Sequence, residues 1–303
     1  FEQVENKFIE LGEIVGSELE ELALSADKNP PKLKKRSRVG TFSNDIEKHP
    51  DFIKMEKFAF EKFGLAAMSH THGVFGLQQP LPPIIKYGLT FLFVQSEFGL
   101  CCPLSMTDSL TRTLTKFGDE KLVEKFFDQL TSQDLDHLFQ GAMFMTEQHA
   151  GSDVGSIDTL AEFEDGNWFL TGDKWFCSNP DADLAMVLAR HNKKISGTKG
   201  LALFLLPKTL ENGDPNNYEI IRLKDKLGGR SFASGEIRLN KAFAYLVGNA
   251  NEGFKQMTDM INMSRLSNGV RASGMMQRCF QESLFISNTR HAFNKKLIDL
   301  PLM

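Results

Sequence analysis

The apolar residues of this chain change their spacing twice along the sequence. At first they recur at helical spacing, as in "DFIKMEKFAFEKFGLAAM" and "DEKLVEKFFDQL". From about Gly141 they form short runs separated by turn residues, such as "NWFLTG" and "GLALFLLP", which are typical of strands. After Gly248 the helical pattern returns, and the stretch from Gly253 to Phe293 contains no proline. The sequence therefore predicts an α+β protein with a helical domain over 1–139, a β-rich domain over 140–248 and the start of a second helical domain over 249–303.

One irregular stretch interrupts the first helical region. The segment "DKNPPKLKKRSRVG" contains two adjacent prolines and six Lys or Arg residues between Lys28 and Arg38. Charged segments that carry proline are usually solvated connectors, so we expect a connector here. A role in binding nucleic acid or phosphate is the alternative, because the positive charge is concentrated.

The composition excludes several classes of protein. With a net charge of −4 and a pI near 6.0, the chain has no overall attraction for nucleic acid or an anionic membrane. No apolar run reaches the roughly 18 residues that a membrane span needs. The four cysteines, of which Cys101 and Cys102 are adjacent, lack CxxC spacing and favour a reducing compartment. We expect a soluble cytoplasmic protein; a mitochondrial location stays open because a targeting segment can be removed.

The two ends of the sequence indicate a piece of a longer protein. The chain opens at Phe1 rather than at a methionine, and Leu302 and Met303 still continue a helical pattern. We therefore expect the second helical domain to be truncated.

No metal site is expected. His70 and His72 have alternating spacing in "SHTHG", but no Cys or carboxylate follows at the spacing of a ligand set. Capping or surface roles suit these histidines better.

The stretch "MFMTEQHAGSDVGS", at positions 143–156, is unusually polar for its surroundings. It is open to two interpretations. In the first, it is a loop whose side chains bond the local backbone, with Gly151 at a positive φ. In the second, the hydroxyls of Thr146 and Ser152, with Gly151 permitting close approach, form a cradle for a planar heterocycle or a pyrophosphate. The stretch is neither a Walker A loop nor GxGxxG.

Four motifs in order decide between these interpretations. They are "MTEQHAGSDVGS", "TGDKWFCSN", "LKDKLGGRSFASGEIRLN" and "RHAFNKKL", the last in a predicted late helix, and together they resemble the acyl-CoA dehydrogenase family. The segments "DKNPPKL", "GLCCPLSMTDSL" and "LIDLPLM" resemble its alkylation-response, AidB-like branch. The resemblance implies an N-terminal helical domain, a middle β-barrel domain and a C-terminal helical bundle. It also implies an FAD flavoprotein of fatty acid metabolism that forms a homotetramer.

The same resemblance implies which residues contact FAD. The backbone at Met143 and Met145 and the Thr146 hydroxyl correspond to groups that hydrogen-bond the isoalloxazine ring. Gly151 permits close approach, and Ser152 corresponds to a hydroxyl near the cofactor phosphates or the substrate. Such contacts tune flavin electronics.

In "KWFCSN", Phe176 aligns with the aromatic residue that packs on the flavin ring, and Ser178 aligns with a hydroxyl near N5 or O4. Trp175 stands one position earlier. Since successive side chains of a strand point to opposite faces, we expect Trp175 to lie in the core.

The last motif implies a contact across a subunit boundary. Arg290 and Phe293 match the pair that reaches the pyrophosphate and adenine of the neighbouring subunit's FAD, which requires at least a dimer and implies a dimer of dimers. Asn294 stands where the family usually has glycine, so the local turn is a point of difference.

The activity implied by the resemblance is α,β-dehydrogenation of an acyl-CoA thioester, which needs a carboxylate base. Ser264, just before Arg265, occupies the base position of the isovaleryl-type branch, and a hydroxyl cannot serve as that base. We therefore assign no catalytic residue in this chain. Two alternatives remain: an AidB-like DNA-binding flavoprotein, whose DNA surface would lie in a region absent here, and an acyl-CoA or fatty-acid binding protein with little turnover.

Overall fold

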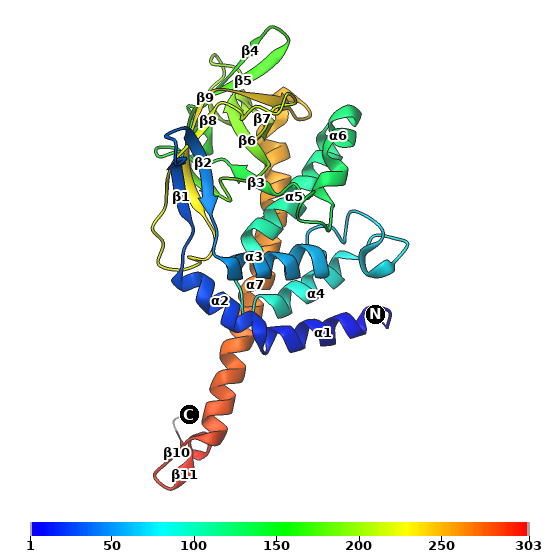
Figure 1. Cartoon of the computed structure of the whole chain (residues 1–303), viewed down its shortest axis with the longest axis vertical. Coiled ribbons are helices and arrows are strands. Elements are labelled where there is room, and N and C mark those ends of the chain that lie inside the picture. The colour runs from blue at the N-terminus through cyan, green and yellow to red at the C-terminus, as the bar shows by residue number, and fades with distance from the viewer. Residues whose placement is uncertain (1, 302–303) are drawn as a thin grey trace.

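The computed structural model describes residues 2–301. Figure 1 shows a β region at one end of the molecule, a group of helices beneath it, and one long C-terminal helix that passes both and projects beyond them. The first part of the chain contains six α-helices, as the periodicity predicts: α1 (Glu5–Val15), α2 (Glu18–Lys28), α3 (Pro50–Glu56), α4 (Pro83–Phe93), α5 (Cys101–Phe117) and α6 (Glu120–Leu130). Short helices are η1 (Lys57–Lys62), η2 (Val74–Gly76), η3 (Val154–Ser156), η4 (Gly197–Gly200), η5 (Ala250–Glu252) and η6 (Leu297–Asp299).

The helical region is built around one apolar core. Leu11, Leu19, Met55, Phe63 and Leu89 come from four different helices and the loop after η1, and all are fully buried in it. Burial of this apolar area, at roughly 25 cal/mol per Å², is what holds the helices against one another.

We expected the basic proline segment to be a solvated connector, and this expectation is wrong. It forms a hairpin of β1 (Lys32–Arg36) and β2 (Phe42–Glu47). The Asn44 amide clamps this hairpin to the neighbouring β region, donating to the carbonyl of Tyr218 at 2.9 Å and accepting from the amide of Ile220 at 2.9 Å. Because these partners lie over 170 positions away in sequence, local charge and proline content could not reveal the strand pairing.

The middle of the chain forms a seven-stranded sheet that closes on itself, as the resemblance implied. Its strands are β3 (Gly141–Phe144), β4 (Leu160–Glu164), β5 (Asn167–Ser178), β6 (Leu184–Arg190), β7 (Leu201–Pro207), β8 (Tyr218–Leu223) and β9 (Ser234–Leu246). Pairing runs from β6 through β7, β9, β5 and β4 and returns to β6, while β3 joins β6 and β8 joins β9. The sequence "EDGN" forms the turn that joins β4 to β5, with Asp165 and Gly166 both at positive φ.

The long helix α7 (Gly253–Thr289) begins against the barrel at a glycine. A Cβ on Gly253 would lie 2.4 Å from the Cα of Ala202, so only glycine permits this contact. The helix then packs along α5 and α4, and its far end projects past the helical core (Figure 1). No helix within residues 2–301 is both long enough and apolar enough to cross a membrane.

The expected continuation of α7 to the chain end is wrong. The helix stops at Thr289, and "RHAFNKKL" forms a small hairpin of β10 (His291–Ala292) and β11 (Lys295–Lys296) rather than a helix. Phe293 and Asn294 make its turn, at φ 53° and 60°. Asparagine tolerates the left-handed conformation well, which explains how Asn294 can stand in for a glycine. The helical pattern predicted at Leu302 and Met303 lies outside the described residues.

Candidate functional site

The first polar motif begins in the last two residues of β3 and continues as the loop after this strand. This strand runs parallel to β6, and the chain continues from it into Met145 and Thr146. The Thr146 carbonyl accepts a hydrogen bond from the amide of Trp175 at 2.8 Å. The structure thus joins the motif that contains Met143, Met145 and Thr146 to the motif that contains Phe176 and Ser178.

A buried ion pair, which the sequence analysis missed, fixes the shape of this loop. The Lys174 ammonium donates to Glu147 at 2.7 Å and to the carbonyl of Leu188 at 2.8 Å. Glu147 also accepts from the amides of Asp158 at 2.7 Å and Thr159 at 3.1 Å. Burial raises the pKa of the Glu147 carboxyl, but Lys174 and the other donors more than offset this and hold it below its ordinary value. The signal in the sequence was a lysine inside an apolar strand, in "DKWFC".

Gly151 and Ser152 follow a tight turn over residues 147–150. Gly151 does not have the positive φ that the loop interpretation expected. A Cβ there would lie 3.6 Å from the Thr146 side chain, which places Gly151 beside Thr146. Ser152 is exposed, and within residues 2–301 neither its hydroxyl nor that of Thr146 has a hydrogen-bond partner. Both hydroxyls are therefore free to contact a ligand.

The expectation for Trp175 is wrong because β5 contains a bulge. Lys174 pairs with Ile237 and Cys177 pairs with Gly235, so β5 has one extra residue here and side-chain alternation is interrupted. Trp175 is half-buried, and the Lys224 ammonium lies 3.2 Å from the centre of its ring and 4.7 Å from that of Phe176. Both aromatic rings therefore contact the same cation. Phe176 is 58% exposed, so its ring is available for stacking.

Ser178, at the end of β5, lies between the barrel and the start of α5. Its hydroxyl is 3.4 Å from that of Ser234 on β9. Burial raises the pKa of Cys102, so this thiol is neutral.

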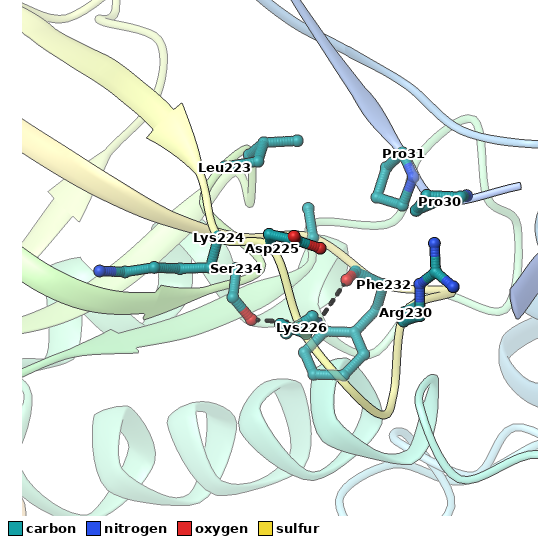
Figure 2. A pocket seen from close by; sticks show the side chains of 10 residues that line it. Pro30, Pro31, Leu223, Lys224, Asp225, Lys226, Arg230, Phe232 and Ser234 are labelled. Carbon is teal, nitrogen blue, oxygen red and sulfur yellow. Dashed lines mark hydrogen bonds between the residues drawn. The ribbon is translucent and has the colours of Figure 1, made fainter.

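A basic pocket of about 170 Å³ adjoins Ser234. Figure 2 shows Lys226 lying between the carbonyl of Phe232 and the Ser234 hydroxyl, to which it donates at 2.7 and 3.3 Å. Burial lowers the pKa of Lys226 to about 8. The complete lining is Pro30, Pro31, Leu223, Lys224, Asp225, Lys226, Arg230, Phe232, Ala233 and Ser234.

Ser264 lies on α7, and its hydroxyl oxygen is enclosed without a hydrogen-bond partner. The nearby Ser267 lines a small cavity between α4, α5 and α7, together with Lys86, Tyr87 and Asp108. Asp108 is already engaged, because it accepts from Lys86 at 2.7 and 2.8 Å and contacts His70 at 2.8 Å.

The structure does not bring Arg290 and Phe293 to the other predicted residues. They belong to the segment of β10 and β11 that follows α7, and Figure 1 shows this hairpin at the projecting end of the helix, away from β3 and β5. Phe293 is 90% exposed. The pair therefore cannot serve the site of its own chain.

The residues near β3 and β5 fit a planar, polar cofactor such as flavin. The Thr146 carbonyl meets the amide of Trp175, next to the exposed ring of Phe176 in sequence, and Gly151 lies beside the Thr146 side chain. No group of three potential metal ligands occurs within residues 2–301.

Sequence profiles show what kind of protein carries this barrel and site. The profile of the acyl-CoA dehydrogenase middle domain matches residues 142–242, and that of the C-terminal domain matches residues 251–303. The profile of the N-terminal domain of the adaptive response protein AidB matches residues 2–137. The chain belongs to the acyl-CoA dehydrogenase family, with an AidB-type N-terminal domain.

Individual relatives agree with this assignment. Acyl-CoA dehydrogenase family member 11 of Caenorhabditis elegans is 31% identical over 300 residues, covering 96% of this chain and 48% of that protein. The putative acyl-CoA dehydrogenase AidB of Escherichia coli K12 is 32% identical over 295 residues, covering 93% of this chain and 52% of that protein. The structure of C. elegans ACDH-11 in complex with C11-CoA has a TM-score of 0.85 at 29% identity, covering 96% of this chain and 50% of that one. This chain thus spans about half the length of these relatives.

Proposed function

We propose that the whole protein is an FAD-dependent acyl-CoA dehydrogenase that removes hydrogen from the α and β carbons of an acyl-CoA thioester. The observation that carries the proposal is the bond between the Thr146 carbonyl and the Trp175 amide, because it joins two motifs into one site. Family membership supports the reaction class, and the likeness to a structure that holds C11-CoA supports the ligand class.

In this proposal the residues at the end of β3 and on β5 hold the cofactor. The backbone of Met143 and Met145 and the Thr146 hydroxyl bind the polar edge of the flavin ring, Phe176 stacks on it, and Ser178 lies near N5. Gly151 and Ser152 lie toward the phosphates or the substrate. When bound, FAD supplies a hydride acceptor at N5.

The base is assigned to a part of the protein outside this chain. Removing the α proton requires a carboxylate near the thioester, and Ser264 offers only a hydroxyl. Glu147 is fully engaged by Lys174 and two amides, so it is not available. We therefore place the base on a Glu or Asp beyond Met303.

The projecting hairpin suggests how subunits complete each other's sites. Arg290 and Phe293 belong to the hairpin of β10 and β11, which Figure 1 shows at the opposite end of the molecule from β5. We propose that they contact the pyrophosphate and adenine of a neighbouring subunit's FAD, in a dimer of dimers.

A second candidate is an acyl-CoA binding flavoprotein with little turnover, which the hydroxyl at Ser264 favours. DNA binding has less support within this chain. In the basic hairpin, Lys34 and Lys35 already pair with Glu47 at 3.0 Å and Glu219 at 3.1 Å.

The test uses the full-length protein. A panel of acyl-CoAs is added without oxygen while the visible flavin band is followed. Bleaching of the band supports the dehydrogenase. A spectral shift without bleaching supports the binding protein, and a colourless protein that takes up no added FAD refutes both.

A further inference from the structure

Lys226 lines the basic pocket without an ion-pair partner. Residues 224–233, which connect β8 to β9, form most of the lining of this pocket (Figure 2). The Lys226 Nζ donates to the carbonyl of Phe232 at 2.7 Å and to the Ser234 hydroxyl at 3.3 Å, and both acceptors are uncharged. Within residues 2–301 it forms no ion pair with an Asp or Glu. The amine therefore lies at the pocket wall with no carboxylate bound to it.

A second lysine of the same pocket, Lys224, differs in this respect. Its Nζ lies 2.6 Å from Oε1 of Glu236. A carboxylate at this distance stabilises the ammonium form, which has no lone pair and cannot act as a nucleophile. The pocket thus contains one paired and one unpaired lysine, two positions apart in sequence.

The surroundings of Lys226 favour its neutral form. The Nζ lies 3.3 Å from the centre of the Phe232 ring, which covers it from one side. Burial lowers the pKa of Lys226 from its ordinary value of 10.5 to about 8. The fraction of neutral amine near pH 7 is therefore roughly 300-fold larger than for an ordinary lysine.

Two carboxyl groups near the pocket do not change this. Asp225 belongs to the lining, and Asp27 accepts from the amide of Arg230 at 2.9 Å. Asp27 raises the pKa of Lys226, but the effect of burial is larger. Neither carboxyl group forms an ion pair with Lys226 within the described part of the chain.

The loop that carries Lys226 is anchored to the helical domain. The bond from the Arg230 amide to Asp27 joins the loop to α2, and the Ser231 hydroxyl donates to Glu97 at 3.1 Å. These contacts hold the amine in place at the pocket.

The pocket has the size and the charge for a short anionic acyl donor. A protein cavity of about 150 Å³ holds benzene, so a pocket of about 170 Å³ has room for an acyl group of up to about six carbons. The Arg230 side chain lines the same pocket, and within residues 2–301 its guanidinium forms no ion pair. A free guanidinium attracts the phosphate groups of an acyl-CoA.

We propose that Lys226 is a modification site, at which the side-chain amine accepts a short acyl group from an acyl-CoA thioester. The nitrogen attacks the carbonyl carbon of the thioester, a bond forms between nitrogen and carbon, and the bond between carbon and sulfur breaks. The proton lost by nitrogen passes to the departing sulfur, which leaves as the CoA thiol. The amide product is uncharged and keeps one N–H for the Phe232 carbonyl. The flavin takes no part in this transfer, so the inference does not rest on the proposed function.

The experiment incubates the full-length protein with acetyl-CoA and no added enzyme. Peptide fragmentation in a mass spectrometer then measures acetylation at Lys226 and at Lys224, which is the internal control. We expect Lys226 to react at least tenfold faster. Its rate should rise about tenfold from pH 6 to pH 7 and level off above about pH 8, because the amine is then largely neutral.

Two variants of Ser234 test the role of the missing carboxylate. Ser234→Asp places a carboxylate where Lys226 now has a neutral acceptor, so acetylation of Lys226 should fall at least tenfold. The matched control Ser234→Ala should change the rate less than about threefold. If Ser234→Asp fails to fold, the pH profile of the unmodified protein decides. Acetylation of Lys226 no faster than that of Lys224, or a rate that still rises steeply up to pH 10, would overturn the inference.

Discussion

Lys174 and Glu147 form an ion pair, 2.7 Å between Nζ and Oε1, with the lysine side chain completely buried. The pair connects the loop after β3 to β5, and so it holds together the two motifs of the candidate flavin site. Lys174 also donates to the carbonyl of Met145 at 3.3 Å. The pair therefore orders the backbone that we expect to face the flavin.

Replacing Lys174 by Met should destabilise the protein by about 3–5 kcal/mol, because Glu147 would remain as a buried unpaired charge. Denaturant unfolding measures this. The double variant Glu147→Gln with Lys174→Met should recover much of the loss. Lys193→Met is a matched control, since its pair with Glu162 is exposed and should contribute less than about 1 kcal/mol. Equal effects of the buried and exposed variants would contradict the assigned role.

The same pair predicts a dependence of stability on pH. The pKa of Glu147 is depressed in the folded protein, so its contribution is present above the ordinary value of 4.5 and is lost as pH falls through the lower folded value. The stability difference between the unmodified protein and Glu147→Gln should therefore be constant near neutral pH and shrink below about pH 4.5. A difference that stays constant down to pH 3 would show that the carboxylate charge contributes nothing.

Phe176→Ala should weaken FAD retention in the full-length protein by about two- to tenfold, the range of one aromatic stacking contact. The ring is exposed and lies on the bulge of β5 beside Ser178. Fluorescence titration of the apoprotein with FAD measures the change. Phe163→Ala, at another exposed aromatic ring of the barrel, should leave FAD affinity unchanged. If Phe163→Ala lowers FAD affinity more than Phe176→Ala does, the flavin ring does not stack on Phe176.

Arg290→Ala should weaken FAD retention by about 2–4 kcal/mol, the range for removing one partner of a buried charge contact. The effect should appear only in the assembled oligomer, because Arg290 lies away from its own chain's β5. Lys295→Ala in the same hairpin serves as the control. Unchanged FAD affinity in a sample shown to be monomeric would remove the basis for a contact between subunits.

Ser264→Ala should change the rate of flavin reduction by acyl-CoA less than about threefold, whereas loss of a true general base lowers a rate about 10²–10⁴-fold. Within residues 2–301 its hydroxyl oxygen has no hydrogen-bond partner that could accept its proton. Rapid-mixing measurements with a branched and a straight-chain acyl-CoA test this. A loss above a hundredfold with FAD still bound would place the base on α7.

Local patterns in the sequence determined most of the architecture. Apolar spacing predicted the helices before Gly141 and the strands after it, because burial requires one face of each element to be apolar. The assignment of Met143, Met145, Thr146, Phe176 and Ser178 to one site came from the resemblance to a family and stays a prediction.

Only the tertiary structure determined the contacts between residues that lie far apart in the sequence. Asn44 fixes the basic hairpin to β8, and Trp175 leaves the core because β5 gains a residue against β9. Glu147 meets Lys174 only after the barrel closes. Periodicity reports which face of an element is buried. It does not indicate which buried charged side chain forms an ion pair, because ion pairing depends on how separate helices and strands pack together.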